Sequence, residues 1–271
     1  MPNEAQQQKP APAAAVAGSA DRGLQILSAL CSHTAPMSAN ELATATGMTR
    51  ATVYRILERL AGERWVIGVG RPRRFSAAVR VGMLGLQALA RNQARQVALS
   101  NAVACAQATG RSCVIGTYDD GDAVFLDGAV VIADRIMITA RAGRVPAACN
   151  AVGKILLAHQ PEREIQRVVA RGVPRFTRYT KTEPQAILDD LAHCRRRGFA
   201  VNDRESGETT GGIAAPVFDQ EGNVVMAIGI DATEVPVSES FINQMAPRLT
   251  MFGARASVEL GYQAASLRRF V

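Results

Sequence analysis

The sequence has little of what disulfide-bonded, metal-binding or membrane-spanning proteins need. Its five cysteines are far apart and form no Cys-x-x-Cys pair, which argues against a disulfide framework or a zinc ribbon. The three histidines are never four residues apart, so no metal site is expected. No run approaches about 18 apolar residues, and the N-terminus lacks a secretion signal. We therefore expect a soluble, cytoplasmic protein with reduced, mostly buried thiols and no membrane contact.

Motifs for catalysis and for cofactor binding are also missing. No Gly-x-Ser-x-Gly, His-Glu-x-x-His or Walker sequence occurs. His193 precedes Cys194, but adjacent helical residues point about 100° apart and cannot act as a catalytic pair. Residues 68–73 (GVGRPR) lack the third glycine of a dinucleotide-binding loop and contain a proline. We expect neither an enzyme nor a cofactor.

What the sequence does contain is enough apolar material for a core and an uneven distribution of positive charge. Of its 271 residues, 48% are hydrophobic and 20% are charged, which predicts a globular chain, and the length favours two domains. The net charge is +7, and residues 21–80 hold nine Lys/Arg but only four Asp/Glu. This excess indicates either a module that binds a polyanion or a solvated basic face.

The first part of the chain predicts a disordered tail followed by short helices. Residues 1–20 consist largely of Ala, Gln and Pro and cannot bury enough surface to offset the entropy of ordering. Apolar residues at helical spacing predict a helix over 21–32. Ser38 and Glu41 then form a capping-box pattern for a second helix, which Gly47 ends.

A third helix is predicted over residues 50–61, with Thr49 as its N-cap. Its core-facing stripe contains Val53, Ile56, Leu57 and Leu60. Two short helices joined around a glycine, the second exposing hydroxyl and guanidinium groups, are typical of a helix-turn-helix. The side chains that we expect in the major groove of duplex DNA are Arg50, Thr52, Tyr54 and Arg55, and Arg59 on the same exposed side is also expected to contact DNA.

A basic hairpin is predicted to follow the third helix. Residues 65–67 and 74–76 have the pattern of short strands, and the turn between them is basic. A basic hairpin beside a recognition helix indicates a wing, with Arg71, Arg73 and Arg74 contacting phosphates or the minor groove. The winged helix-turn-helix domain is thus expected to cover residues 21–80.

The remainder of the chain predicts a helical connector and an α+β domain. Residues 79–109 are helical in character with weak breaks at Gly82 and Gly85, so 81–109 is assigned as a linker helix. The second domain is expected over 110–265. Strands are predicted at 112–118, 123–127, 135–139, 199–202, 212–218 and 224–230. Helices are predicted at about 149–159, 162–170, 184–197 and 238–263. Short hairpin turns indicate a largely antiparallel sheet.

Glycines interrupt the apolar strands over 212–218 and 224–230. Glycines inside strands either leave space for a ligand to approach or mark bulges and bends in the sheet. The sequence pattern leaves both interpretations open.

Four segments together resemble the IclR family of bacterial transcription regulators. They are MSANELATATGMTRATVYRILERLAGERWV (37–66), GRVPAACNAVGKILLAH (143–159), RRRGFAVNDRESG (195–207) and GGIAAPVFDQEGNVVMAIGI (211–230). The resemblance runs from about residue 21 to residue 260. It implies a winged helix-turn-helix, a linker helix used in dimerisation, and an effector domain similar to GAF or PAS sensors.

The resemblance also implies an effector pocket. By motif, the pocket would contain Ala151, Val152, Asn202, Thr210, Gly212, Gly229 and Asp231. Many relatives have Cys at position 212 and Ser at 229 and 231, so the glycines are expected to enlarge the pocket. Asp231 would repel a carboxylate effector unless it is protonated or paired. A carboxylate effector would then need a cation from outside this set, such as Arg135 or Arg141.

The sequence as a whole favours a ligand-responsive, DNA-binding regulator of a catabolic operon. Its partners would be double-stranded operator DNA and a small effector, and the chain would form a homodimer or a dimer of dimers. An aromatic or hydroxylated metabolite fits the predicted pocket better than a sugar phosphate, because the pocket residues include no Lys/Arg cluster. The alternative is a GAF-like sensor or scaffold that acts through a protein partner instead of DNA.

Overall fold

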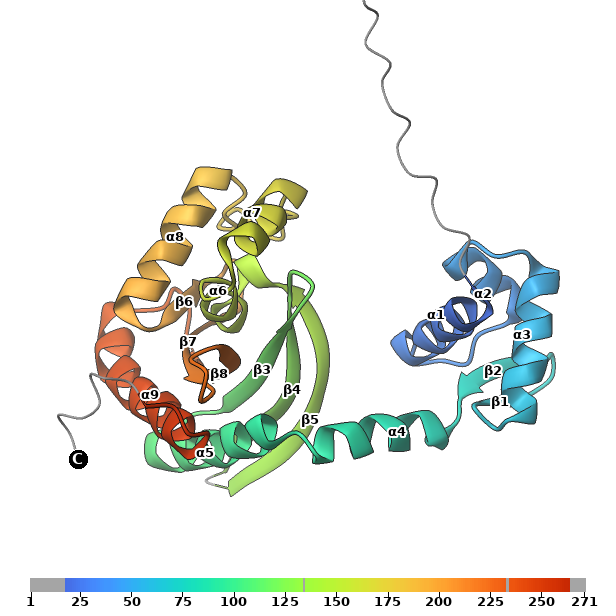
Figure 1. Cartoon of the computed structure of the whole chain (residues 1–271), viewed down its shortest axis with the longest axis horizontal. Helices are drawn as coiled ribbons and strands as arrows, with labels where there is room; N and C mark the ends of the chain where they lie inside the picture. Colours follow the sequence, from blue (N-terminus) through green and yellow to red (C-terminus); the bar gives the residue numbers. More distant parts are fainter. Residues whose placement is uncertain (1–17, 134, 233, 264–271) are drawn as a thin grey trace, which may run out of the picture. The chain divides into compact units, whose positions relative to one another are not determined.

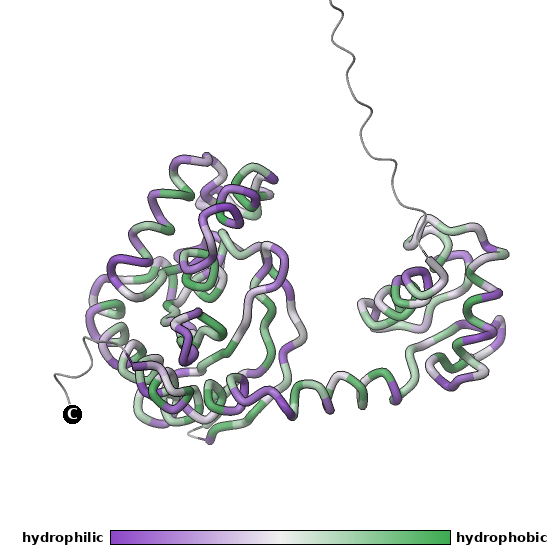
Figure 2. The backbone as a smooth tube through the Cα atoms, viewed as in Figure 1, coloured by the Kyte–Doolittle hydropathy of each residue, from purple (hydrophilic) through white to green (hydrophobic). Residues whose placement is uncertain are grey.

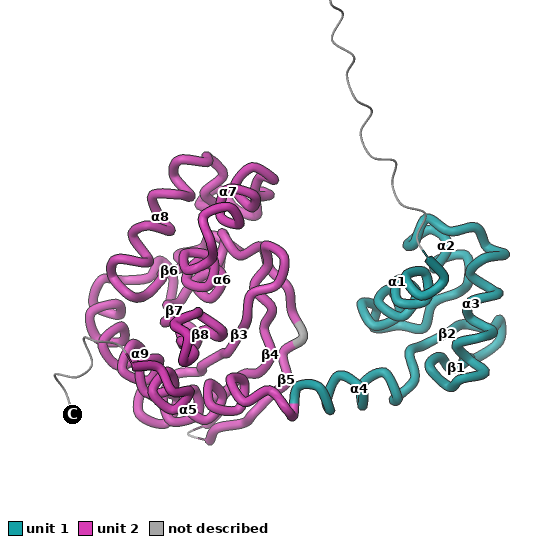
Figure 3. The backbone as a smooth tube through the Cα atoms, viewed as in Figure 1, with its two compact units in different colours: residues 1–89 teal, residues 90–271 magenta. Residues whose placement is uncertain are grey.

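The computed structural model divides the chain into two compact units, residues 1–89 and residues 90–271 (Figure 3). It describes residues 18–133, 135–232 and 234–263. Of the predicted tail, Ser19 and Ala20 already belong to the first helix, and residues 1–17 lie outside the described residues. Each unit has its own buried apolar core, so each is described by itself.

The first unit is a helix-turn-helix followed by a hairpin and one more helix (Figure 1). Its elements are α1 (Ser19–Ser32), α2 (Ala39–Thr46), α3 (Arg50–Gly62), β1 (Val66–Val69), β2 (Arg74–Ala77) and α4 (Val79–Ala90). The predicted caps are present: Ser38 Oγ accepts from Glu41 N, and Thr49 Oγ1 accepts from Thr52 N, both at 3.3 Å. Gly47 ends α2 at φ 68°, a left-handed conformation that favours glycine.

The hairpin is fixed to the helices through its second strand. β1 and β2 pair antiparallel, and Phe75 of β2 also forms two backbone hydrogen bonds with Met37, which directly precedes the cap of α2. Phe75 and Met37 are buried with Val53 and Leu57 of α3 in one core. The winged helix-turn-helix expected from the sequence is therefore confirmed as a fold.

Helix α4 has no buried residue, although most of its side chains are apolar (Figure 2). Val79 is 81% exposed, and Met83, Leu84 and Leu86 are all more than half exposed. An amphipathic surface helix normally buries one apolar stripe, and α4 buries none within its own unit.

The predicted connector is broken at a different place from the one expected. The sequence indicated weak breaks at Gly82 and Gly85, but both glycines lie inside α4. The break falls at Arg91 and Asn92, and the Asn92 side chain accepts a hydrogen bond from Arg95 N at 2.9 Å, which caps α5 (Gln93–Thr109). A cap satisfies amides that a continuous helix would bond internally, so Asn92 starts a new helix.

The second unit contains one six-stranded antiparallel sheet with the order β5-β4-β3-β8-β7-β6. The strands are β3 (Cys113–Asp119), β4 (Asp122–Ile132), β5 (Arg135–Pro146), β6 (Ala200–Asp203), β7 (Gly211–Phe218) and β8 (Val224–Asp231). The α+β class and the antiparallel sheet agree with the expectation. Both strands are longer than expected: β4 continues past Asp127 to Ile132, which pairs with Arg135, and β5 continues past Thr139 to Pro146, which pairs with Asp122.

Helices cover both faces of this sheet. α5 and α9 (Glu239–Glu259) pack on one face around Ile115, Met226 and Ile228. The other face carries η1 (Ala147–Cys149), α6 (Ala151–Leu157), α7 (Glu162–Arg171) and α8 (Pro184–Arg197). All five cysteines are free thiols, and all except Cys31 are buried. Among the described residues, no helix combines the length and apolar character needed to cross a bilayer.

Candidate functional sites

The exposed face of α3 carries most of the residues predicted to contact DNA. Val53 and Leu57 are buried, whereas Arg50, Tyr54, Arg55 and Arg59 are exposed on the remaining surface of the helix. The Arg50 guanidinium lies 5.5 Å from the centre of the Tyr54 ring. Thr52 is half-buried, and its hydroxyl is hydrogen-bonded to that of Thr49 at 2.9 Å.

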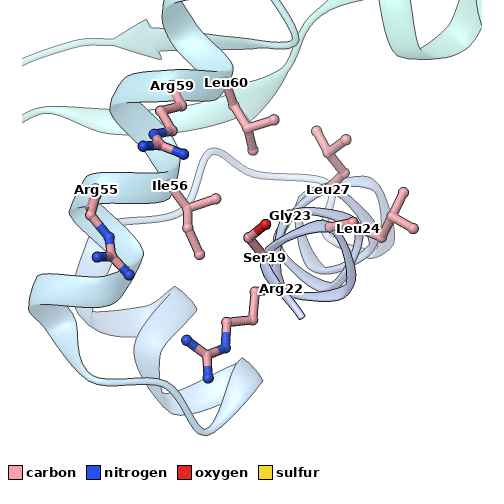
Figure 4. A pocket seen from close by; sticks show the side chains of 10 residues that line it. Ser19, Arg22, Gly23, Leu24, Leu27, Arg55, Ile56, Arg59 and Leu60 are labelled. Atoms are coloured by element: carbon pink, nitrogen blue, oxygen red, sulfur yellow. The ribbon is translucent and has the colours of Figure 1, made fainter. Parts of the chain in front are cut away.

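Arg55 and Arg59 also border a groove between α1 and α3 that the sequence did not predict (Figure 4). The groove has a volume of about 620 Å³ and an apolar lining from both helices. Its lining side chains include Leu24, Leu27, Ile56 and Leu60, with Arg22 at the rim. Helical periodicity places side chains on one helix, but it gives no distance between two helices, so a groove of this kind has no sequence signal.

The three wing arginines have different surroundings. Arg71 is exposed, and Arg73 is exposed with its guanidinium 5.2 Å from the centre of the Phe75 ring. Arg74 differs: its Nη2 donates to both carboxylate oxygens of Glu41, at 2.8 and 2.6 Å, and its Nε donates to the Pro36 carbonyl at 2.7 Å. The hydrogen bonds of Glu41 with Arg74 and with Ser38 lower the pKa of Glu41 to about 2. Arg74 therefore ties the turn end of the wing hairpin to α2.

The seven residues predicted for the effector pocket gather around one cavity in the second unit. Ala151, Val152, Asn202, Thr210, Gly212, Gly229 and Asp231 all line a cavity of about 280 Å³. They come from the start of α6, from β6 and the loop after it, and from the paired strands β7 and β8. Further lining residues include Val114, Phe125, Val145, Asn150, Ser206 and Arg141.

The glycines of this cavity do not enlarge it, contrary to the expectation from the sequence. A Cβ atom on Gly212 would lie 2.5 Å from the Ile230 carbonyl oxygen, and one on Gly229 would lie 3.0 Å from Val152 Cγ2. On β3, a Cβ on Gly116 would lie 2.8 Å from Val152 Cγ1. The glycines thus admit protein atoms: Val152 of α6 packs directly onto the backbone of the sheet.

One wall of the cavity is polar. Asn202 Nδ2 is within hydrogen-bonding distance of Ser206 Oγ (3.3 Å) and Thr210 Oγ1 (3.5 Å), and Asn202 Oδ1 accepts from Glu205 N at 3.0 Å. Asn150 Oδ1 accepts from Gly153 N at 2.8 Å and so caps α6. Hydroxyl and amide groups on this wall can exchange their hydrogen bonds with those of a ligand.

Beneath the polar wall, a buried ion cluster holds α6 against α8 and the loop after β6. Lys154 Nζ donates to Glu205 Oε1 at 2.6 Å and to Asp190 Oδ2 at 2.9 Å, and Lys181 bonds the same two carboxylates. Burial, the largest influence, lowers the pKa of Lys154, but the two carboxylates together raise it above its ordinary value. Lys154 is therefore a charged ammonium in the protein interior.

Opposite charges face the cavity without neutralising each other. Asp231 on β8 and Arg141 on β5 both line it, and neither side chain forms a hydrogen bond or ion pair with any residue that the structure describes. Burial raises the pKa of Asp231, and the positive charge of Arg141 opposes this shift. Arg135, the other cation suggested by the sequence, does not line the cavity.

Comparison with known protein families matches both units. Residues 19–67 match the IclR helix-turn-helix domain, and residues 86–257 match the bacterial transcriptional regulator IclR C-terminal family. The chain is 28% identical over 262 residues to the HTH-type transcriptional regulator BhcR of Paracoccus denitrificans, covering 90% of each chain. It is 26% identical over 224 residues to the HTH-type transcriptional regulator KdgR of Escherichia coli, covering 82% of this chain and 85% of KdgR.

Solved structures share the fold. One is an IclR homologue from Microbacterium hydrocarbonoxydans complexed with 4-hydroxybenzoate, with a TM-score of 0.74 and 21% identity, covering 90% of this chain and 99% of the homologue. The two family matches together span the helix-turn-helix and most of the second unit. The chain therefore belongs to the IclR family of bacterial transcriptional regulators, whose members are not enzymes.

Proposed function

We propose that this regulator binds operator DNA through its first unit and a small organic effector in the 280 Å³ cavity of its second unit. The observation that carries the proposal is the convergence of all seven predicted pocket residues, from four separate segments, on that single cavity. Effector binding would change the affinity for the operator and thereby the transcription of a catabolic operon.

The DNA-binding half of the proposal rests on seven side chains. Arg55, at the centre of the exposed face of α3, would read a base edge in the major groove. The other six are Arg50, Thr52, Tyr54, Arg59, Arg71 and Arg73. Arg74 is left out of this set, because its hydrogen bonds to Glu41 and Pro36 already engage its guanidinium.

The effector half rests on the size and chemistry of the cavity. A volume of about 280 Å³ suits a molecule with one ring or a short chain. Phe125, Val114 and Val145 give it an apolar side, and Asn202 and Thr210 give it a polar side. The 4-hydroxybenzoate bound by the Microbacterium homologue is of this size and kind. We extend the same class, small aromatic or aliphatic metabolites, to this chain.

The quaternary structure that we propose is a homodimer, or a dimer of dimers, on a near-palindromic site. One winged helix makes too few base contacts for specificity at the level of an operon. Helix α4 supplies an unpartnered apolar surface at Val79, Met83, Leu84 and Leu86 that a second copy can cover. Sedimentation at micromolar concentration should give at least twice the 28.8 kDa of one chain. A monomer would contradict this part of the proposal.

DNA binding is tested by gel shifts on the promoter region upstream of the protein's own gene. Arg55→Ala should weaken binding by about 1–3 kcal/mol if Arg55 reads a guanine. Arg248→Ala is the matched control, because it removes the same charge from an exposed site on α9. Equal affinities for wild type and Arg55→Ala would refute the assignment. Failure of the wild type to bind any duplex DNA would favour the alternative, a sensor that acts through a protein partner.

Effector binding is tested by filling the cavity. Gly229→Leu is unsuitable, because a side chain there would collide with Val152 and Val114 in the core. Ala151→Leu adds volume at the cavity wall instead, and Ala192→Leu makes the same change at an exposed position of α8. Ala151→Leu should abolish the response to effector while leaving operator affinity intact. An unaltered response in a folded Ala151→Leu protein would place the effector elsewhere.

A further inference from the structure

The carboxylate of Asp231 is enclosed but unused by the protein. Asp231 lies at the end of β8, opposite Gly212, and its backbone N–H donates to the Ser112 carbonyl at 3.1 Å. Its side chain lines the cavity and forms no hydrogen bond or ion pair with any described residue. A half-buried carboxylate without a partner is costly to keep ionised, which is why burial raises its pKa.

Arg141, an exposed residue of the strand β5 at the sheet edge, lines the same cavity. The Arg141 guanidinium lies beside Gly128, where a Cβ atom would lie 3.2 Å from Arg141 Nε. A Cβ atom at position 128 would require this side chain to shift slightly, so Gly128 leaves room for Arg141. Within the described part of the chain, the Arg141 guanidinium also has no hydrogen-bond or ion-pair partner.

Other carboxylates of the second unit form ion pairs with neighbouring arginines. Asp127, which is also on the sheet, pairs with Arg95 at 2.7 Å, and Asp203 at the end of β6 pairs with Arg204 at 3.0 Å. Asp231 and Arg141 are close enough for the charge of one to affect the pKa of the other, yet they form no ion pair. Asp231 and Arg141 thus bring opposite charges to one cavity without forming an ion pair with each other.

We propose that the effector carries a carboxylate at one end, held by Arg141, and a hydrogen-bond donor at the other, an ammonium or a hydroxyl, held by Asp231. This inference rests on the proposed function and narrows it to one class, small amino acids and hydroxy acids. A guanidinium suits a carboxylate because it offers parallel N–H donors. The negative charge of Asp231 discriminates against dicarboxylates and against simple carboxylic acids, which bring no donor to it.

Two matched sets of probes test the inference by calorimetry on the full-length protein. The aromatic set is benzoate, 4-hydroxybenzoate and 4-(aminomethyl)benzoate, and the aliphatic set is butanoate, 4-hydroxybutanoate and 4-aminobutanoate. Within each set the carboxylate is constant. The far end carries no hydrogen-bond donor in the first member, a hydroxyl in the second and an ammonium in the third. In at least one set, a member with a donor should bind at least about tenfold more tightly than the member without one.

Three variants identify the residues. Asp231→Asn should remove the preference for the ammonium member by about tenfold or more while leaving binding of benzoate or butanoate unchanged or improved. Arg141→Gln should weaken every member of the preferred set by about tenfold or more. Arg135→Gln, which removes the same charge from the same strand outside the cavity, should change no affinity.

Equal affinities for members with and without a donor would overturn the inference, and so would equal effects of Arg141→Gln and Arg135→Gln. Absence of binding by all six probes would overturn it as well. These results are distinguishable from failure of the proposed function. If donor-free probes bind the protein and release the operator in gel shifts, the proposed function remains supported. Only the proposed selection of effectors by Asp231 and Arg141 is then refuted.

Discussion

The two units use arginine and acidic side chains in opposite ways. In the described part of the first unit, the only ion pair is Arg74 with Glu41, and the side chains of Arg55, Arg59 and Arg71 form no hydrogen bond or ion pair. In the second unit, arginines and lysines pair repeatedly with carboxylates, as in Arg144 with Asp119 and Asp122. Arg55, Arg59 and Arg71 of the first unit remain available to a polyanion, whereas many charges of the second unit are paired within the fold.

The comparison predicts that removing a charge costs folding stability in the second unit and DNA affinity in the first. Lys154→Met should produce the largest effect. It leaves the buried Glu205 carboxylate with Lys181 alone, and breaking a buried pair costs about 3–5 kcal/mol in the free energy of unfolding. Denaturant unfolding of the full chain measures this loss.

Lys181→Met is the control for that measurement. Lys181 bonds the same two carboxylates, but its side chain is 37% exposed, so its loss should cost less. Equal destabilisation by the two substitutions would mean that burial does not decide the effect.

A smaller effect is expected at the wing, and it should appear in binding. Arg71→Ala or Arg73→Ala should weaken binding to all DNA sequences alike and reduce the salt slope by about 1, because each removes a phosphate contact. The free energy of unfolding should change by less than about 0.5 kcal/mol. Affinities measured from low to high salt give the slope. A wing variant with an unchanged slope would remove the wing from the DNA interface.

Asp231 tests the comparison from the other side, because it is a charge in the second unit that the fold does not use. Burial raises its folded-state pKa above the ordinary 3.8. The folded protein therefore binds this proton more tightly, and the resulting stability is full below the unfolded-state pKa and is lost as pH rises through the folded-state pKa. The Asn side chain of the Asp231→Asn variant does not ionise, so this variant does not lose that stability as pH rises. The melting temperature of Asp231→Asn minus that of wild type should therefore increase between about pH 3 and pH 7. A difference that stays constant would contradict the raised pKa of Asp231.

Glu41 should give the smallest effect. Hydrogen bonds with Arg74 and with Ser38 lower its pKa to about 2, so the carboxylate contributes stability above the ordinary value of 4.5, and this contribution is lost as pH falls through about 2. Glu41→Gln should therefore flatten the acid dependence of unfolding of the first unit. Because the Glu41 side chain is 49% exposed, high salt should remove most of the difference. A difference that persists in high salt would indicate a stronger interaction than the geometry supports.

Local signals were sufficient to predict most of the fold. Caps at Ser38 and Thr49 and the apolar stripe of α3 depend only on near neighbours in the sequence, and the structure contains them. The long β4–β5 hairpin was underestimated, because Asp127 and Gly128 resemble turn residues. In the structure, Arg95 of α5 neutralises Asp127 and Arg141 covers Gly128, and neither contact is visible in a local pattern.

The sequence predicted which residues form the candidate sites, but not how these residues are arranged in space. The family resemblance selected seven pocket residues, and the structure brings them together. It could not show that the space beside Gly212 and Gly229 is filled by the protein, that Arg74 is held by Glu41, or that Arg141 and not Arg135 lines the cavity. Each of these facts depends on distances between segments far apart in the chain.

The direct packing of Val152 on Gly116 and Gly229 has a consequence for how this regulator can change its effector during evolution or engineering. A side chain at either glycine would collide with α6, and one at Gly153 would lie 2.3 Å from the Ala147 carbonyl oxygen. This side of the cavity is therefore closed to substitution. New specificities are better sought at lining residues that do not pack on the sheet glycines, such as Ser206, Thr210 and Arg141. A library restricted to those three positions should retain folding while it samples new ligands.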